Sequence, residues 1–208
     1  MDWIFGIGTF AIFFVSLVAI IRFQRHQGLK VFSWFLWISF FFEMILHYTA
    51  GKMIHNWWII DVFCIFEVLF LFLFLSQFIP YFNNHIRLKS WGLILIACYF
   101  VGLIFGGETK IHWVFVSLVV FCLSAFSLAT YCLENEKGSL FKDPFFWVLS
   151  GMVLYYGVTS LTFNPFVILK KGSNLERFLP LVNQVMNILA YIFYSIGYLC
   201  KKPAILTS

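Results

Sequence analysis

Three carboxylates, Glu43, Asp61 and Glu67, lie in stretches of sequence that are otherwise almost entirely apolar. A charged side chain at bilayer depth costs at least about 2.5–3.5 kcal/mol, so it normally faces a protein interior or a water-filled cavity. His47 follows Glu43 by four residues, which places both side chains on one face of a helix. Such a pair can bind a cation, relay a proton or hold a charged ligand. The alternative is that a protonated Glu43 only joins neighbouring helices.

The three carboxylates differ in how much their positions indicate function. Asp61 and Glu67 are six residues apart, about 240° around a helix, so they cannot share one face. Asp61 is close to the expected membrane surface, where water alone can solvate it. Glu67 is deeper, with apolar residues on both sides. Glu43 and Glu67 are therefore the carboxylates that we favour for a functional role.

The last apolar stretch adds polar side chains at helical spacing. Asn183, Asn187, Tyr191 and Tyr194 fall on one stripe of a helix, where they contribute either to a site or to hydrogen bonds between helices. Together with a tyrosine from the preceding stretch, the candidate ligand-binding or proton-binding residues are Glu43, His47, Glu67, Asn183, Asn187, Asp61 and Tyr156. The sequence assigns no catalytic residue, no metal ligand and no cofactor.

These residues must be positioned by helices that cross a membrane. The 208-residue chain is 62% hydrophobic and only 11% charged, with a mean hydropathy of +0.92, whereas a water-soluble domain needs far more charge on its surface. A spanning helix needs about 20 apolar residues. Seven segments fit that length: 3–21, 31–50, 57–79, 91–107, 112–133, 145–169 and 178–200. We predict an all-α polytopic membrane protein with seven transmembrane helices in a single domain, residues 1–208.

The cations of the loops predict a direction across the membrane. One side collects nine, Arg22, Arg25, Lys30, Arg87, Lys89, Lys137, Lys142, Lys201 and Lys202; the other has five, Lys52, Lys110, Lys170, Lys171 and Arg177. Cytoplasmic loops carry the excess, so the N-terminus is expected outside and the C-terminus inside the cytoplasmic membrane. The three carboxylates and His47 then lie in the outer half, as an outward-facing polar pocket. Asn164-Pro165 predicts a helix break near the outer face.

Motifs of known enzyme classes are absent from the sequence. It contains no HExxH, no GxSxG and no phosphate-binding glycine loop, and its cysteines form no CxxC pair. A lipid enzyme would need a metal held by His47 with His55 or His112 and a carboxylate, which is a poor donor set. The cations fall in short clusters between apolar runs, which does not resemble a nucleic-acid-binding stripe. We favour a non-enzymatic role and leave enzymatic activity open.

Three segments resemble one family of membrane proteins. They are residues 143–169, residues 183–200 and the stretch IIDVFCIFEVLFLFLFL, with the matching features Pro144-Phe145-Phe146-Trp147, Ser150-Gly151, Tyr155, Glu67, Asn187 and Tyr191. The family comprises small seven-helix integral membrane proteins of Bacteroidota-type bacteria, which look like stand-alone versions of the membrane sensor regions found beside histidine kinases. The resemblance implies a signalling role with a separate partner protein.

The sequence is most consistent with a sensor or receptor-like module. In this hypothesis an outward-facing pocket binds a small ligand or proton, and helix rearrangement is passed to a partner membrane protein such as a histidine kinase. Two alternatives stay open. The chain is a structural subunit of a larger membrane complex, or it is a small proton-coupled transporter that uses the same carboxylates.

Overall fold

The computed structural model describes residues 2–52, 57–79, 85–106, 111–135, 139–168 and 174–201. This part of the chain is almost entirely helical and contains no β-strand. Its α-helices are α1 (Asp2–Ile21), α2 (Lys30–Gly51), α3 (Trp57–Leu75), α4 (His85–Gly106), α5 (Ile111–Glu134), α6 (Pro144–Ile168) and α7 (Asn174–Leu199). Short 3-10 turns, η1 (Gln27–Leu29), η2 (Ser76–Phe78) and η5 (Leu140–Lys142), precede α2, extend α3 and precede α6. The prediction of an all-α protein is confirmed.

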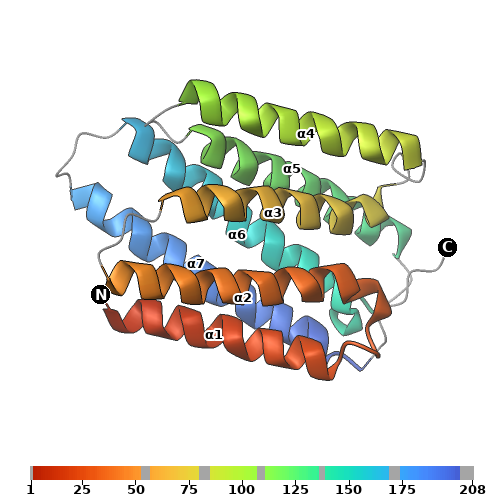
Figure 1. The fold of residues 1–208 in the computed structure, drawn as a ribbon. Coiled ribbons are helices and arrows are strands. Elements are labelled where there is room, and N and C mark those ends of the chain that lie inside the picture. Colours follow the sequence, from red (N-terminus) through yellow and green to blue (C-terminus); the bar gives the residue numbers. More distant parts are fainter. Residues whose placement is uncertain are drawn as a thin grey trace.

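The helices form one bundle and alternate in direction, so the two ends of the chain lie at opposite ends of it (Figure 1). We call the bundle end that holds Asp2 the N-end and the end that holds Lys201 the C-end. Contacts between neighbours run through α1, α2, α3, α5, α6 and α7 and close from α7 back to α1. α4 packs outside this ring, against α3 and α5 (Figure 1). The ring leaves a common centre toward which several helices turn their polar side chains.

The outer surface of the bundle suits a membrane. Within the described residues, five segments are long and apolar enough to cross one: Gln27–Thr49, Trp58–Phe78, Arg87–Ile104, Trp113–Glu134 and Pro144–Thr162. Gly6–Ile21 is a shorter apolar helix, and α7 does not qualify because it carries the asparagines, glutamine and tyrosines of its inward face. Phe10, Ile104 and Leu161 are each about 70% exposed. Apolar side chains exposed on this scale are typical of a surface covered by lipid.

The C-end half of the core is aromatic. Phe32 of α2 packs on Phe74 of α3 at 5.1 Å between ring centroids and on Tyr194 of α7 at 4.9 Å. Phe78 continues this cluster, 5.5 Å from Phe74 and 5.1 Å from Phe145 of α6. Each of these rings is at least 94% buried. The cluster joins four helices and is mainly apolar; Tyr131 of α5 packs on its edge, 5.7 Å from Phe78 and 5.8 Å from Phe145.

Hydrogen bonds tie the α1–α2 connection to the end of α7. The buried His26 donates from Nε2 to the Tyr198 carbonyl at 3.0 Å, and the Tyr198 hydroxyl is 2.7 Å from Ser33 Oγ of α2. Arg25 donates to the carbonyl of Lys201. Burial lowers the pKa of His26 from its ordinary value; the backbone hydrogen bond opposes this effect and nearby arginine charges reinforce it. The ring is therefore held in its neutral form.

The helix bounds differ from the sequence prediction at two starts. α4 begins at His85 and α7 at Asn174, six and four residues before the apolar segments predicted there. A helix can extend past the apolar layer because polar side chains at its end reach water. The predicted break at Asn164-Pro165 is wrong, since α6 continues to Ile168. Pro165 removes one backbone hydrogen bond, the one to the carbonyl of Leu161, but the helix continues past it for three residues.

Part of the basis for the predicted direction falls outside the described residues. This applies to Lys110, Lys137, Lys170, Lys171 and Lys202, and to the side chain of Arg177. The number of spans and the direction across the membrane therefore stay predictions.

Candidate functional site

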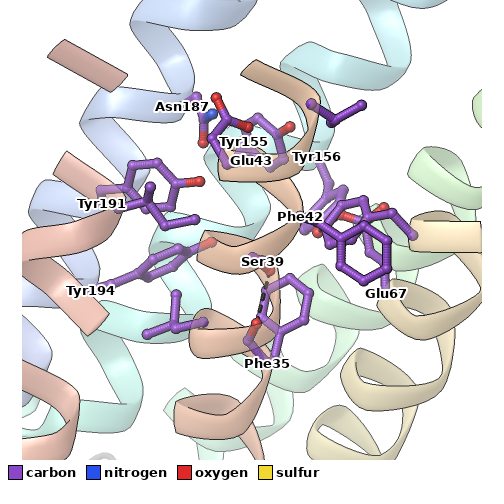
Figure 2. A pocket seen from close by; sticks show the side chains of 14 residues that line it. Phe35, Ser39, Phe42, Glu43, Glu67, Tyr155, Tyr156, Asn187, Tyr191 and Tyr194 are labelled. Atoms are coloured by element: carbon purple, nitrogen blue, oxygen red, sulfur yellow. Dashed lines mark hydrogen bonds between the residues drawn. The ribbon is translucent and has the colours of Figure 1, made fainter. Parts of the chain in front are cut away.

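A cavity of about 90 Å³ lies inside the ring, where α1, α2, α3, α6 and α7 face one another (Figure 2). Fourteen side chains line it. Its polar lining consists of Ser39 and Glu43 from α2, Glu67 from α3, Tyr155 and Tyr156 from α6, and Asn187, Tyr191 and Tyr194 from α7. The other lining side chains are apolar and come from α1, α2 and α3. Two carboxylates, four phenol rings and one amide thus share one small space.

Glu67 has a fixed hydrogen-bond donor in this cavity. The Tyr156 hydroxyl donates to Glu67 Oε1 at 2.5 Å. That distance falls in the range of about 2.5–2.7 Å found for a hydroxyl bonded to a carboxylate. The Tyr156 ring is only 3% exposed and packs edge to face on Tyr155, with 4.9 Å between centroids. The donor is therefore held in place by packing and fixes where the Glu67 carboxylate lies.

Glu43 has other neighbours. It lies close enough to Tyr155 and Tyr191 to act on both electrostatically, and Tyr191 is hydrogen-bonded to Asn187. Figure 2 shows Glu43 beside Asn187 and Tyr155. Tyr155 is also within electrostatic range of Glu67, so this tyrosine connects the surroundings of the two carboxylates. A change in the charge of Glu43 or of Glu67 therefore alters the electrostatic environment of the Tyr155 hydroxyl.

Helix geometry puts the cavity near the middle of the apolar layer. Glu67 is about 15 Å from the start of α3 at Trp57 and about 12 Å from its end at Leu75. Glu43 is about 12 Å from the end of α2 at Gly51. The hydrocarbon core of a bilayer is about 30 Å thick. Glu67 is thus closer to mid-depth than an outer-half pocket would place it.

The surroundings of the cavity differ toward the two ends of the bundle. Toward the C-end lies the aromatic cluster around Phe32 and Phe74. Toward the N-end, one turn of α7 beyond Asn187, Asn183 accepts a hydrogen bond from the Thr159 hydroxyl at 2.8 Å. Polar side chains therefore adjoin the cavity toward the N-end, whereas toward the C-end the aromatic cluster lies between the cavity and the buried polar groups Ser33 and Tyr198.

Four of the seven predicted site residues line the cavity together: Glu43, Glu67, Tyr156 and Asn187. Asn183 lies one turn away and is bonded to Thr159. The sequence spacing correctly placed both asparagines on the inward face of one helix. Only the second of them reaches the cavity.

His47 does not line the cavity and is exposed on α2. The inward face of α2 runs through Leu36, Ser39, Glu43 and Leu46, at helical spacing. His47 is one residue beyond that face and is turned outward by about 100° from Leu46. It is still close enough to act electrostatically on Glu43. The four-residue spacing of Glu43 and His47 thus correctly indicated that they are neighbours, but the two side chains do not share a pocket.

Asp61 also lies outside the cavity. Its Oδ1 accepts a hydrogen bond from the Trp113 indole N–H at 2.9 Å, and its backbone carbonyl accepts one from the Tyr99 hydroxyl at 2.8 Å. These bonds join α3 to α5 and α4. Asp61 therefore takes part in hydrogen bonds between helices and, unlike Glu43 and Glu67, does not line the cavity.

Four polar side chains of the cavity were not among the predicted site residues: Ser39, Tyr155, Tyr191 and Tyr194. The sequence did contain a signal for three of them. Ser39 precedes Glu43 by four residues, and the two α7 tyrosines follow Asn187 by four and seven, so each shares a helix face with a predicted residue. Tyr155 had no such signal, because helical spacing alone does not say which helices face each other. Ser39 already donates to the Phe35 carbonyl at 2.8 Å.

The donors of this site are oxygen atoms and one amide nitrogen. Within the described part of the chain, no three His, Cys, Asp or Glu side chains gather where they could hold a metal ion together. His55 and the side chain of His112, which the lipid-enzyme alternative needs, lie outside the described residues. The arrangement can hold protons, water molecules or a small cation. The chain matches no protein-family model, and neither a curated protein nor a solved structure is found to be similar to it.

Proposed function

We propose that this chain is a seven-span sensor of the bacterial inner membrane, in which the central cavity binds a proton or a small cation and alters the helix packing that a partner reads. One observation carries the proposal: Glu43 and Glu67, from different helices, line the same small cavity near mid-depth. Carboxylates at this depth are costly, and they are usually retained in membrane helices because ions or protons use them.

The size of the cavity limits the ligand. A water molecule needs about 10–15 Å³ of such space, so about 90 Å³ accommodates several waters or one small hydrated ion. Pockets for drug-sized ligands measure about 300–1,000 Å³. A sugar, a peptide or a nucleotide is therefore excluded in this conformation. The lining supplies oxygen ligands from Glu43, Glu67 and Tyr156, which suit a proton or a hard cation.

The surroundings of the cavity favour a sensor over a carrier. A carrier needs polar access from both sides, but the aromatic cluster around Phe32, Phe74 and Phe78 blocks the way toward the C-end. Access toward the N-end is supported by the hydrogen-bonded pair Asn183 and Thr159. With the N-end outside, as the loop cations indicate, the site would respond to conditions outside the membrane.

The proposal is tested with Glu43→Gln and Glu67→Gln in lipid nanodiscs, with Asp61→Asn as the matched control. Asp61 is also a carboxylate in an apolar span, but it lies outside the cavity. Infrared difference spectra during a pH titration report the protonation of buried carboxyls. Protection against hydrogen exchange, corrected for the intrinsic amide exchange rate at each pH, reports helix packing. We expect a pH-dependent change in the protection of α2 and α7 that either cavity substitution removes and the control keeps.

Two results would contradict the proposal. One is a protection of α2 and α7 against exchange, corrected for the intrinsic rate, that does not depend on pH in the unmodified protein. The other is a pH response that survives in the double variant of Glu43 and Glu67. The titration is repeated in sodium chloride and in choline chloride. If the cavity binds a small cation, sodium competes with the proton at a fixed pH and the response differs between the two salts. If it binds only a proton, the response is the same in both.

A structural subunit of a membrane complex is the second candidate function, and α4 is the observation that favours it. This helix packs on α3 and α5 from outside the ring, and Leu93 and Ile104 are 67% and 71% exposed. A partner helix could cover this face as well as lipid does. Native mass spectrometry of the complex extracted in mild detergent tests it: a mass equal to the single chain plus lipids contradicts a stable complex.

A further inference from the structure

A second hollow lies on the outside of the bundle, between the C-end halves of α1 and α2. Its volume is about 620 Å³. Ile20 and Ile21 of α1 form one wall, and Trp34, Trp37 and Phe41 of α2 form the other. Ile21 is 70% exposed and Trp34 is 58% exposed, so this groove opens on the surface that would face lipid.

The groove has a cation at its C-end. Lys30, Trp34, Trp37 and Phe41 are spaced by four, three and four residues, which puts them on one face of α2. Lys30 is the first residue of that helix. The distance along the axis from Lys30 to Phe41 is about 16 Å, close to half of the hydrocarbon thickness of about 30 Å. The residues of α2 that line the groove, Ser33 to Phe41, extend over about 12 Å of this distance, and Lys30 lies about 4.5 Å beyond them at the C-end.

Lys30 does not itself line the groove, but it contacts Phe23, which does. Lys30 Nζ lies 5.7 Å from the centroid of the Phe23 ring. Phe23 in turn packs edge to face on Trp34, at 6.2 Å between centroids. The Lys30 side chain is exposed, so its ammonium group is accessible to a lipid phosphate.

The charged residues of the α1–α2 connection and of the start of α2 are all positive. Arg22 and Arg25 precede Lys30 in the α1–α2 connection, and the sequence has no Asp or Glu between Asp2 and Glu43. An anionic headgroup is attracted to such a cluster, whereas a zwitterionic headgroup brings a cation of its own.

We infer that this groove binds one anionic phospholipid, with an acyl chain along Trp34, Trp37 and Phe41 and its phosphate at Lys30. A helix of a partner protein would fill the apolar wall equally well, but it has no phosphate to meet the cation. The site shares no residue with the Glu43–Glu67 cavity and does not depend on what that cavity binds.

The test uses nanodiscs made from equal parts of dioleoyl phosphatidylglycerol and dioleoyl phosphatidylethanolamine, from which the protein is released into a native mass spectrometer. Lys30→Gln removes the headgroup contact, and Lys89→Gln removes an exposed cation at the same bundle end outside the groove. Trp34→Ala removes part of the wall, and Trp91→Ala removes a similarly exposed tryptophan of α4. All four positions are on the surface, so the fold should be retained, which thermal melting verifies.

We expect the unmodified protein to retain phosphatidylglycerol over phosphatidylethanolamine. One cation near the membrane surface corresponds to about a fivefold change in the affinity for an anionic lipid, so K30Q should lower this retention about fivefold. W34A should lower it too, and K89Q and W91A should not. Equal retention of both lipids, equal losses in K30Q and K89Q, or a co-purifying protein in place of lipid would each overturn the inference.

Discussion

Removing the Tyr156 hydroxyl is the most direct test of how the cavity is built. Tyr156→Phe keeps the buried ring and deletes only the donor to Glu67 Oε1, which lies 2.5 Å away. No other donor to Glu67 is evident among the bonds of the described residues. The substitution therefore leaves a carboxylate at mid-depth without its hydrogen bond, while the packing against Tyr155 is retained.

The magnitude depends on the charge of Glu67. Hydrogen bonds between neutral groups inside membrane proteins contribute about 0.6 kcal/mol on average. Hydrogen bonds to charged groups contribute about 1.5–3 kcal/mol. The short bond is typical of an ionised acceptor, so we expect Tyr156→Phe to lower the free energy of unfolding by about 1.5–3 kcal/mol in mildly alkaline buffer. In acid the loss should fall toward about 0.6 kcal/mol, because a protonated Glu67 no longer gains from the extra electrostatic attraction.

A double-mutant cycle isolates the bond. Glu67→Met removes the acceptor with little change in volume, and in that background Tyr156→Phe should have almost no effect. The free energies come from reversible unfolding in mixed micelles, followed by circular dichroism. Tyr198→Phe is the control, because its hydroxyl bonds Ser33 near the C-end and its effect should add to that of Glu67→Met. A coupling energy below about 0.5 kcal/mol at alkaline pH would refute the bond and the geometry built on it.

Three further predictions concern packing, capping and pH. Gly151→Ala should destabilise by about 1–3 kcal/mol, because the new Cβ would lie 2.7 Å from Tyr194 Cε1, whereas Gly6→Ala meets nothing within 4 Å and should leave the melting temperature unchanged or higher. Asp143→Ala should cost about 1 kcal/mol, since its carboxylate accepts a backbone N–H in the first turn of α6, and Asp143→Ser should restore most of it in the same melting assay. Burial lowers the pKa of His26 in the folded protein, so the contribution of this residue to the free energy of unfolding is fully present above its ordinary pKa of about 6.5. That contribution declines as the pH falls through the lowered value, by at most about 1.4 kcal/mol per pH unit. Melting temperatures measured across this range should show that acid-dependent loss, and His26→Gln should remove it.

The helices could be predicted from sequence because lipid imposes a simple rule on them. About 20 apolar residues are needed to cross, and each predicted segment overlaps one α-helix of the described residues. The starts of α4 and α7 were less accurate, because hydropathy marks the apolar layer while a helix such as α4, with Arg87 and Lys89 in its first turns, continues beyond it. The continuity of α6 through Pro165 was missed because a proline signals a break only where the surrounding helix gains little from continuing.

The candidate site was recoverable in part, and the missing part has a geometric cause. Depth and helical spacing relate residues within one helix, so they grouped Asn187 with Tyr191, which both line the cavity, but also Glu43 with His47, which does not. They do not give the rotation of each helix about its axis. That rotation turns His47 outward and brings Tyr155 inward, although sequence alone makes the histidine the more conspicuous residue.

Two helices of the bundle take part in both the cavity and the C-end contacts, which gives the proposed sensor a physical route. α2 carries Glu43 in the cavity and Ser33 at the C-end, and α7 carries Asn187 in the cavity and Tyr198 at the C-end. The bond between Ser33 and Tyr198 fixes the spacing of these helices at one end, while the charge of Glu43 acts on their spacing about 15 Å away along α2. Helices are stiff over such a distance, so in the proposed sensor a changed charge in the cavity would tilt α2 against α7 or strain the bond between Ser33 and Tyr198. In both cases the change would reach the α1–α2 connection, where a partner protein could detect it.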